Sequence, residues 1–209
     1  MEVIDFVSEH LGQPRARILE IGCGDGELAR ALARDGHSIT AIDPRAPLGP
    51  IFQQVPLERF DEATTFDAIV ANRSLHYVHE LGPALDKIEA LLEPDGVLVL
   101  NEFAWDRMDG PTARWYFSHR AEGTSPISSL TAETFPEAWI AEHEGLHTSS
   151  VMKDQLEAHF ATRVFEWVPY IARNYLDRAD LVSREAESIA RGDINAVGFR
   201  YVGTRRSEG

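Results

Sequence analysis

The acidic and glycine residues between positions 20 and 43 have the types and spacing to bind a nucleotide-like ligand. The stretch from Glu20 to Gly26 has the sequence E-I-G-C-G-D-G, and a further carboxylate follows at Asp43. Glycines let the backbone turn sharply and approach a ligand without Cβ atoms in the way. A carboxylate can accept hydrogen bonds from two ribose hydroxyls. The pattern predicts a site where backbone N–H groups underlie the ligand and a carboxylate holds its ribose.

The elements around these residues follow from the local pattern. Residues 17–21 form a short apolar run that is typical of a buried parallel strand. A helix should begin with Asp25 as its N-cap and end at Gly36. Its apolar face comprises Leu28, Ala31 and Leu32. Residues 37–42 then predict a second strand, which ends at Asp43.

Two ligand classes compete for this strand–loop–helix–strand unit. A dinucleotide oxidoreductase that binds NAD would have G-x-G-x-x-G and room for a pyrophosphate, whereas this chain has E-x-G-x-G-x-G. The latter resembles motif I of the class I S-adenosylmethionine (SAM) dependent methyltransferases. An acidic residue beside the loop would repel a pyrophosphate, but SAM carries no phosphate.

The resemblance implies roles for individual residues. In the family, the acid of the first strand helps to bind the amino-acid end of SAM, the glycines underlie the ligand, and the acid after the second strand binds the ribose. The segment FDAIVANRSLHYVHEL, residues 66–81, resembles the family's fourth-strand segment, whose end borders both SAM and the substrate. The cofactor site implied in this way comprises Glu20, Gly22, Cys23, Gly24, Gly26, Asp43, Pro44 and Asn72.

Methyl transfer requires that the acceptor be aligned with the S–CH₃ bond, that water be excluded and, for a hydroxyl or amine, that a proton be removed. His76 is the best candidate for the general base, because imidazole titrates near working pH and this residue follows the fourth strand. The alternative is a histidine that only shapes the pocket or caps the next helix. The candidate substrate-binding residues are Arg73, Glu102, Trp105, Trp115, Tyr116 and His119.

A second motif, His143-Glu144-Gly145-Leu146-His147, matches the H-E-x-x-H pattern of zinc metalloproteases. That chemistry needs a stable helix to bring both imidazoles onto one face. Gly145 weakens a helix, and residues 148–150 resemble the N-cap of the following one. We therefore expect no metal site here, and bound zinc at one ion per chain would favour a hydrolase instead.

Composition narrows the class of partner. With 34 acidic and 20 basic residues, the net charge is −14, which disfavours nucleic acid as a partner and favours a small molecule. Cys23 is the only cysteine, so no intramolecular disulfide can form and a reducing compartment fits. The first ten residues do not resemble a signal peptide, and no stretch has membrane-spanning length. We expect a cytoplasmic protein whose oligomeric state the sequence does not indicate.

Strands that alternate with helices predict an α/β fold with a parallel sheet and helices on both faces. The resemblance implies a Rossmann-like three-layer sandwich whose seven-stranded sheet is mostly parallel, with the last strand antiparallel. The remaining strands are expected at residues 51–55, 66–71, 97–103, 161–168 and 196–204, and the remaining helices at residues 3–11, 81–92, 151–160 and within 170–191.

Residues 104–149 show no regular pattern, and all four tryptophans lie beyond residue 103. We interpret residues 104–149 and 169–195 as insertions in one domain, 1–209, that form a lid over the substrate. The alternative is that they only pack on the core. The predicted function is methylation of O or N in a small organic molecule; a SAM-binding regulatory protein without catalysis is the other class considered.

Overall fold

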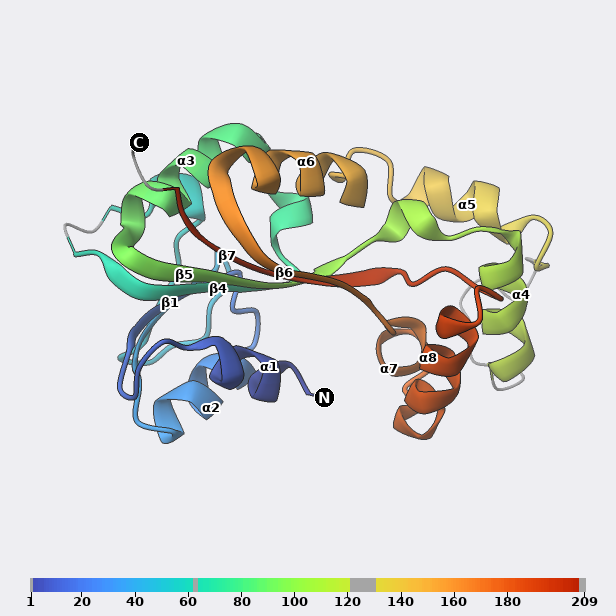
Figure 1. The fold of residues 1–209 in the computed structure, drawn as a ribbon, viewed down its shortest axis with the longest axis horizontal. Helices are drawn as coiled ribbons and strands as arrows, with labels where there is room; N and C mark the ends of the chain where they lie inside the picture. The colour runs from blue at the N-terminus through green and yellow to red at the C-terminus, as the bar shows by residue number, and fades with distance from the viewer. Residues whose placement is uncertain (1, 62–63, 121–130, 207–209) are drawn as a thin grey trace. The chain divides into compact units, whose positions relative to one another are not determined.

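The computed structural model describes residues 2–61, 64–120 and 131–206 and contains a seven-stranded sheet in the order β3-β2-β1-β4-β5-β7-β6 (Figure 1). The sheet is mostly parallel, and β7 is the antiparallel strand, as predicted. The strands are β1 Arg17–Ile21, β2 Ser38–Ile42, β3 Phe52–Gln53, β4 Phe66–Asn72, β5 Leu92–Phe103, β6 Phe160–Val168 and β7 Gly198–Arg205.

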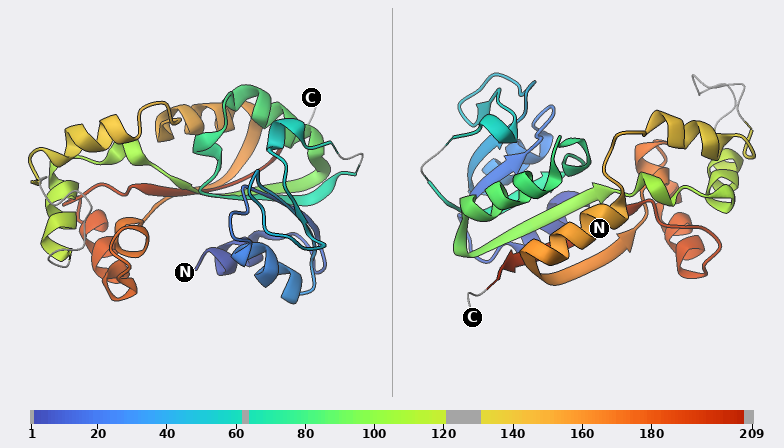
Figure 2. Two further views of the ribbon diagram at one scale, coloured as in Figure 1. Left: turned by 180° about the vertical axis from the view of Figure 1, so that it is seen from behind. Right: turned by 90° about the horizontal axis from the view of Figure 1, so that it is seen from above.

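Helices lie on both faces of this sheet, which gives the three-layer sandwich. Helices α1 (Val3–His10) and α2 (Glu27–Arg34) lie on one face, and α3 (Leu81–Leu91) and α6 (Ser149–His159) on the other (Figures 1 and 2). The other helices are α4 Gly110–His119, α5 Phe135–Glu142, α7 Ile171–Asn174 and α8 Val182–Ala190, and the 3₁₀ turns are η1 Leu57–Arg59, η2 Leu75–Tyr77, η3 Trp105–Arg107 and η4 Ala179–Leu181.

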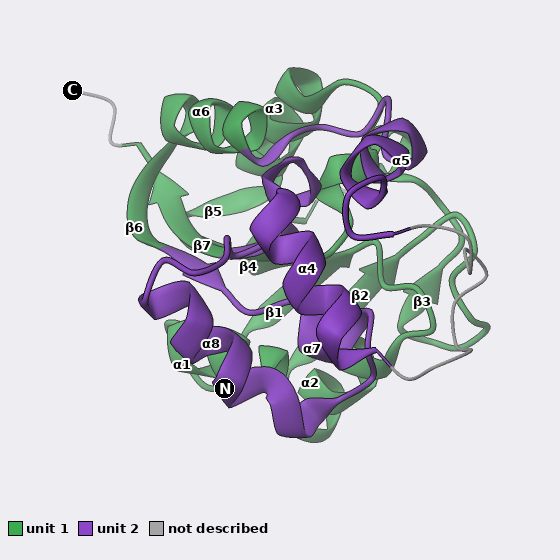
Figure 3. Cartoon of the chain, turned by 90° about the vertical axis from the view of Figure 1, so that its right-hand side faces the viewer, with its two compact units in different colours: residues 1–102, 150–165, 200–209 green, residues 103–149, 166–199 purple. Residues whose placement is uncertain are grey.

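The chain divides into two compact units (Figure 3). Unit 1 comprises residues 1–102, 150–165 and 200–209, and unit 2 comprises residues 103–149 and 166–199. The core of unit 1 contains buried residues of α1, α2, β1 and β4, including Phe6, Leu32 and Val70. Unit 2 has a separate aromatic core that includes Phe103, Trp105 and Trp139.

Strand β1 determines where the candidate ligand residues lie. It pairs in parallel with β2 from Arg17↔Ser38 to Ile21↔Ile42 and with β4 from Ile18↔Ala68 to Ile21↔Ala71. Its residues 18–21 are all buried, so both faces are covered and an apolar sequence is favoured. Because parallel strands end at the same edge, the loops that follow β1, β2 and β4 are neighbours.

Two boundaries differ from the sequence-based expectation. The N-cap of α2 is Gly26, not Asp25, because the backbone is left-handed at Gly26 and the Asp25 carboxylate instead accepts a hydrogen bond from the N–H of Glu27 at 3.2 Å. Strand β3 is only two residues long. The prolines before it shorten the crossover, and the absence of a helix there was expected.

Strand β5 begins at Leu92 and not at Val97. The register changes from Phe66↔Leu92 to Ala68↔Val97, so β5 has more residues than β4 in this interval. A bulge accommodates residues 94–96, Pro-Asp-Gly, which we had expected to lie before the strand. Turn-forming residues thus occur inside a strand where the ladder is irregular.

Helices α4 and α5 lie in the segment where the sequence showed no regular pattern. Helix α4 nevertheless has clear start signals: Asp109 is its N-cap and accepts a hydrogen bond from the N–H of Thr112 at 2.9 Å, and Pro111 follows in the first turn. The described part of the chain contains no helix that is long and apolar enough to cross a membrane.

Candidate active site

The glycine loop after β1 is shaped by positions that exclude a side chain. Gly22 and Gly26 have φ of 71° and 78°, a region that favours glycine. A Cβ at Gly22 would lie 2.3 Å from Cβ of Ser74, and one at Gly26 would lie 2.4 Å from the Phe52 ring. A Cβ at Gly24 would instead enter open space, with no atom within 4 Å. The loop therefore packs at both ends and leaves room above its middle.

Glu20 carries a buried carboxylate oxygen that lacks a partner. The residue is 2% exposed, and Oε2 has no hydrogen-bond partner among the described groups. Burial raises the pKa of Glu20 to about 8; a hydrogen bond from the N–H of Ala29 lowers it, and repulsion from Asp25 and Asp43 raises it further. A buried polar atom without a partner is costly, so this oxygen is suited to a cationic donor such as an ammonium group.

Cys23 lies within the glycine loop, and Asp43 is hydrogen-bonded to that loop. Oδ2 of Asp43 accepts a hydrogen bond from the N–H of Gly24 at 3.2 Å, and Oδ1 accepts one from the N–H of Arg45 at 2.7 Å. The carboxylate is thereby held beside the loop, with lone pairs remaining for ribose hydroxyls. Burial, with repulsion from Glu20 and Asp43, raises the pKa of Cys23 to about 12, which keeps its thiol protonated near neutral pH.

Asn72, at the end of β4, is the last of three side chains that are linked by hydrogen bonds in one donor-to-acceptor direction. The Arg200 guanidinium can only donate, and its Nε lies 3.3 Å from Oδ1 of Asn101. Asn101 therefore donates through Nδ2 to Oδ1 of Asn72 at 2.9 Å. The Asn72 amide N–H groups are left as donors, which suits a ligand carboxylate or hydroxyl oxygen. Asn101 and Arg200 were not predicted, because nothing in their local sequence indicates this long-range contact.

His76 and Glu102, which were predicted separately, form a buried pair. Nδ1 of His76 lies 2.7 Å from Oε2 of Glu102, and the two side chains are 2% and 0% exposed. Oε1 of Glu102 accepts hydrogen bonds from the N–H groups of Ser74 and Leu75 at 2.9 and 2.8 Å. Glu102, which we predicted to contact the substrate, is thus hydrogen-bonded to the segment after β4 and to His76.

Ser74, one of the residues just past the fourth strand that were expected to border SAM and the substrate, connects this pair to the glycine loop. Its hydroxyl donates to the carbonyl of Ile21 at 2.7 Å, immediately before Gly22. The next residue back, Arg73, has a positive φ of 57° and donates its N–H to the carbonyl of Asn101 at 2.8 Å. The candidate cofactor and catalytic residues therefore share one hydrogen-bonded framework within unit 1.

The aromatic candidates lie in unit 2. Trp105 is 8% exposed, donates its indole N–H to the carbonyl of His147 at 3.1 Å and belongs to the core of that unit. Trp115 and His119 stack on each other at 4.3 Å, and Tyr116 stacks on Phe135 at 5.3 Å. Trp115, Tyr116 and His119 are half-buried.

The H-E-x-x-H segment does not form the helix that a zinc site needs. Helix α5 ends at Glu142, and Gly145 has a φ of 93° within the following turn. Nδ1 of His143 is bonded to the carbonyl of Trp139 at 2.8 Å. Among the residues that the structure describes, no three His, Cys, Asp or Glu side chains are grouped as metal ligands.

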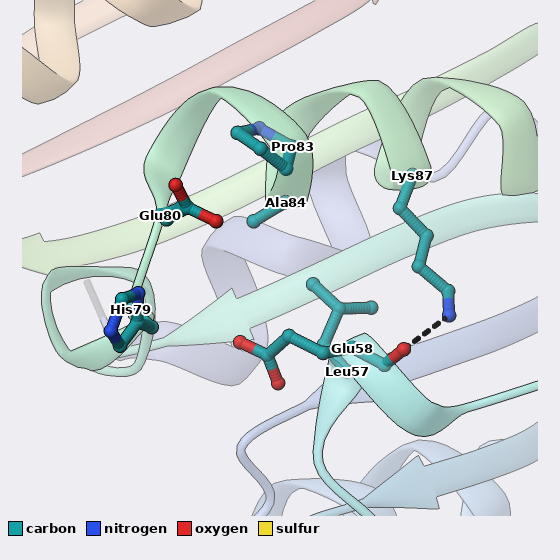
Figure 4. A pocket seen from close by; sticks show the side chains of 7 residues that line it. All are labelled: Leu57, Glu58, His79, Glu80, Pro83, Ala84 and Lys87. Atoms are coloured by element: carbon teal, nitrogen blue, oxygen red, sulfur yellow. Dashed lines mark hydrogen bonds between the residues drawn. The ribbon is translucent and has the colours of Figure 1, made fainter.

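A separate cavity of about 280 Å³ lies in unit 1 between η1 and the start of α3 (Figure 4). It is lined by Leu57, Glu58, His79, Glu80, Pro83, Ala84 and Lys87, and the Lys87 ammonium donates to the carbonyl of Glu58 at 3.2 Å. Its lining includes none of the residues predicted to bind the cofactor.

Comparison with known proteins identifies the family. A family model described as a methyltransferase domain matches residues 1–151. The chain belongs to this methyltransferase family. It is an enzyme that uses SAM as methyl donor, and the NAD-binding and non-catalytic alternatives are set aside.

Individual relatives agree with this assignment. The chain is 27% identical over 167 residues to a ubiquinone biosynthesis O-methyltransferase of Xylella fastidiosa, covering 71% of this chain and 68% of the relative. Among solved structures, it is similar to a Burkholderia thailandensis 1,6-didemethyltoxoflavin-N1-methyltransferase, with a TM-score of 0.58, 20% identity and coverage of 98% and 76%. A SAM-dependent methyltransferase from Mesorhizobium loti gives a TM-score of 0.59, 17% identity and coverage of 97% and 98%. The structural similarities concern the fold.

The residues present fit SAM. The unpartnered oxygen of Glu20 suits its ammonium, the Asp43 carboxylate suits its ribose, and the open space above Gly24 accommodates its body. When bound, SAM supplies a methyl group activated by a sulfonium.

The contrast between two glycines gives a first prediction. Gly22→Ala should lower the thermal unfolding temperature more than Gly24→Ala, because only the former places a Cβ against Ser74. Gly24→Ala should instead weaken SAM binding at least about tenfold, because its Cβ occupies the ligand's space. Differential scanning fluorimetry and calorimetry measure both. Unchanged SAM affinity in Gly24→Ala would contradict the assignment of this loop.

The raised pKa of Glu20 gives a second prediction. An acid whose pKa is higher in the folded than in the unfolded state contributes stability at low pH that is lost as pH rises, here between 4.5 and about 8. Glu20→Gln should remove this loss. Its free energy of unfolding relative to the wild type should therefore increase, by on the order of 1–3 kcal/mol, from pH 4.5 to pH 8.

Urea denaturation at several pH values measures this difference, and Glu27→Gln, at an exposed position on α2, is the matched control. If the free energies of unfolding of Glu20→Gln and the wild type changed with pH in parallel, the pKa of Glu20 would not be raised in the folded protein.

Proposed function

We propose that this enzyme methylates an oxygen or nitrogen atom of a small organic molecule, with His76 as general base. The observation that carries the proposal is the framework around Ser74. It links the glycine loop, through Ile21, to the buried pair of His76 and Glu102. A group that removes a proton must lie close to the atom that receives the methyl group, and this framework joins the cofactor loop to the only buried imidazole–carboxylate pair in the described residues.

The cofactor contacts we propose are those of the glycine loop and the strand ends around it. Glu20 binds the ammonium of SAM, Gly22, Cys23, Gly24 and Gly26 underlie the ligand, Asp43 and Pro44 border its ribose, and Asn72 donates to the methionine part. The assignments of Glu20, Asp43 and Asn72 agree with the hydrogen-bonding capacity that each side chain retains after its internal contacts.

The acceptor assignment is supported by three features. The net charge of −14 disfavours a polyanion. The relative from Xylella fastidiosa is named for methylation at oxygen in ubiquinone biosynthesis. The described parts of segments 104–149 and 169–195 are rich in aromatic side chains, which suit a compact organic molecule.

We assign those segments the role of a lid, with Arg73, Trp115, Tyr116 and His119 as substrate contacts. Trp105 supports them from the core of unit 2, since its indole N–H is already bonded. Residues 121–130 of this proposed lid lie outside the described residues. We further propose that the enzyme acts in the cytoplasm and does not act on nucleic acid.

The acceptor class gives a third prediction. Incubation of the enzyme with methyl-tritiated SAM and a mixture of bulk tRNA, total protein and a metabolite extract should place the label in the small-molecule fraction, because an acidic protein repels polyanions. Separation by size before scintillation counting measures the distribution, and His76→Gln should reduce the incorporation. Label in tRNA or protein, with none in small molecules, would contradict the proposed function.

A further inference from the structure

Four neighbouring strands of the sheet, β1, β4, β5 and β7, each contribute one polar side chain to the same face. Side chains of paired residues in a parallel ladder point to one face, as do those of residues two apart in a strand. Glu20 of β1 pairs with Val70, which lies two residues before Asn72 in β4. Asn72 pairs with Asn101 of β5, and Nε of Arg200 in β7 donates to Asn101 at 3.3 Å. We call these four residues, Glu20, Asn72, Asn101 and Arg200, the polar row.

The polar row crosses a face that is otherwise apolar. Val70, Val99 and Val202, each two residues from a member of the row, belong to the core of unit 1. Arg200 is only 8% exposed, and its guanidinium lies 4.8 Å from the ring centroid of Phe6 in α1. Polar groups in such surroundings cost free energy unless hydrogen bonds satisfy them. The direction of each hydrogen bond in the row is therefore set by what the groups can donate or accept.

That direction leaves a donor at the open end of the row. Whatever else its guanidinium contacts, Arg200 can only donate, so Asn101 presents its oxygen to Arg200 and its NH₂ group to Asn72. Nδ2 of Asn72 then has no protein partner in the described part of the chain. The one buried side-chain nitrogen or oxygen without a partner there is Oε2 of Glu20, so Nδ2 of Asn72 is open to solvent.

We propose that Asn101 and Arg200 are positioning residues that hold the Asn72 amide with its N–H groups toward the carboxylate of SAM. This inference rests on the proposed contact of Asn72 with the methionine part. That end of SAM carries an ammonium and a carboxylate on one carbon, and the adjacent strands β1 and β4 offer an acceptor at Glu20 and a donor at Asn72. Asn101 and Arg200 touch no ligand in this assignment; they act through Asn72, whose reversed amide would place its oxygen against the ligand carboxylate.

Calorimetry with two ligands isolates the carboxylate in the wild-type protein. S-adenosylhomocysteine keeps the whole amino-acid end, whereas its decarboxylated analogue, S-adenosyl-3-thiopropylamine, keeps the ammonium alone. The analogue should bind at least about tenfold more weakly, because a hydrogen bond to a charged group is lost. Equal affinities would overturn the proposal. Failure to bind S-adenosylhomocysteine at all would instead remove the cofactor assignment on which the proposed function depends.

Asn101→Asp reverses the direction of the row at little change in shape. The introduced carboxylate still accepts from Arg200 but cannot donate to Asn72, so the Asn72 amide should rotate and present its oxygen to the ligand. The affinity for S-adenosylhomocysteine should fall at least about tenfold, whereas the analogue should bind at least as tightly as to the wild type. A residue that only supported the fold would weaken both ligands equally, and that result would overturn the proposal.

A double-mutant cycle separates orientation from the added negative charge. If Asn101→Asp acts by turning Asn72, it should change the ratio of the two affinities in the wild type but not in Asn72→Leu. The same change of ratio in both backgrounds would show a direct effect of charge and overturn the proposal. For Arg200, Arg200→Lys keeps a group that can only donate and should retain more of the preference for the carboxylate than Arg200→Met; equal preference in the two variants would remove Arg200 from the assignment.

Nitrogen-15 NMR of the wild-type protein keeps the test independent of how the variants fold. The chain has only four asparagines, so their side-chain amides are resolved by selective labelling. The Asn72 NH₂ signal should shift with S-adenosylhomocysteine and much less with the analogue. Asn195 is the internal control, because its NH₂ group is bonded to the carbonyl of Arg107 at 3.2 Å and to Asp109 at 3.0 Å. An Asn72 signal that responded equally to both ligands would overturn the proposal.

Discussion

The parallel pairing of β1 with β2 on one side and β4 on the other is the interaction on which the site depends. It places the glycine loop, Asp43 and the segment after β4 at one edge of the sheet. The loop then packs by direct contact, since Gly22 lies against Ser74 and Gly26 against Phe52. A side chain at either glycine would separate elements that the sheet has brought together.

Buried carboxylates distinguish the structural from the ligand-binding parts of the chain. Glu185, which is fully buried, accepts three backbone N–H groups at 2.8–2.9 Å at the start of α7. Glu102 likewise accepts two N–H groups and pairs with His76. Glu20 differs because one of its buried oxygens has no partner among the described groups. Burying an oxygen without a partner costs free energy, and no contact within the described fold offsets this cost. A cationic ligand would compensate for it.

Much of the cofactor framework could be predicted from the sequence because its determinants are local. Strand, glycine loop, helix and terminal acid follow one another within residues 17–43. The predicted seven-stranded, mostly parallel sheet with an antiparallel last strand agrees with the observed one. Local sequence patterns gave wrong element boundaries where contacts between distant parts of the chain determine the structure. The bulge around residues 94–96 depends on the pairing of β5 with β4. The N-cap of α2 is Gly26 and not the predicted Asp25, because the backbone turns at Gly26.

The buried pair of His76 and Glu102 shows the same limit. The sequence indicated His76 and Glu102 as separate candidates. Only the parallel pairing of β4 with β5 brings Nδ1 of His76 within 2.7 Å of Oε2 of Glu102. The roles of Asn101 and Arg200 likewise arise from contacts between distant parts of the chain. Helix α4 was predictable in principle from Asp109 and Pro111, and its weak apolar periodicity explains why it was missed.

The central claim is that the unpartnered oxygen of the Glu20 carboxylate, Oε2, receives the ammonium group of SAM. Its pKa of about 8 means that the side chain is mostly protonated at pH 7 and must lose its proton to pair with a cation. The direct measurement is calorimetry of SAM binding at pH 7 in two buffers with different heats of ionisation, for the wild type and Glu20→Gln. The wild type should release most of one proton for each SAM bound, and Glu20→Gln should bind more weakly and release markedly less. Equal affinity and equal proton release in the two proteins would contradict the account.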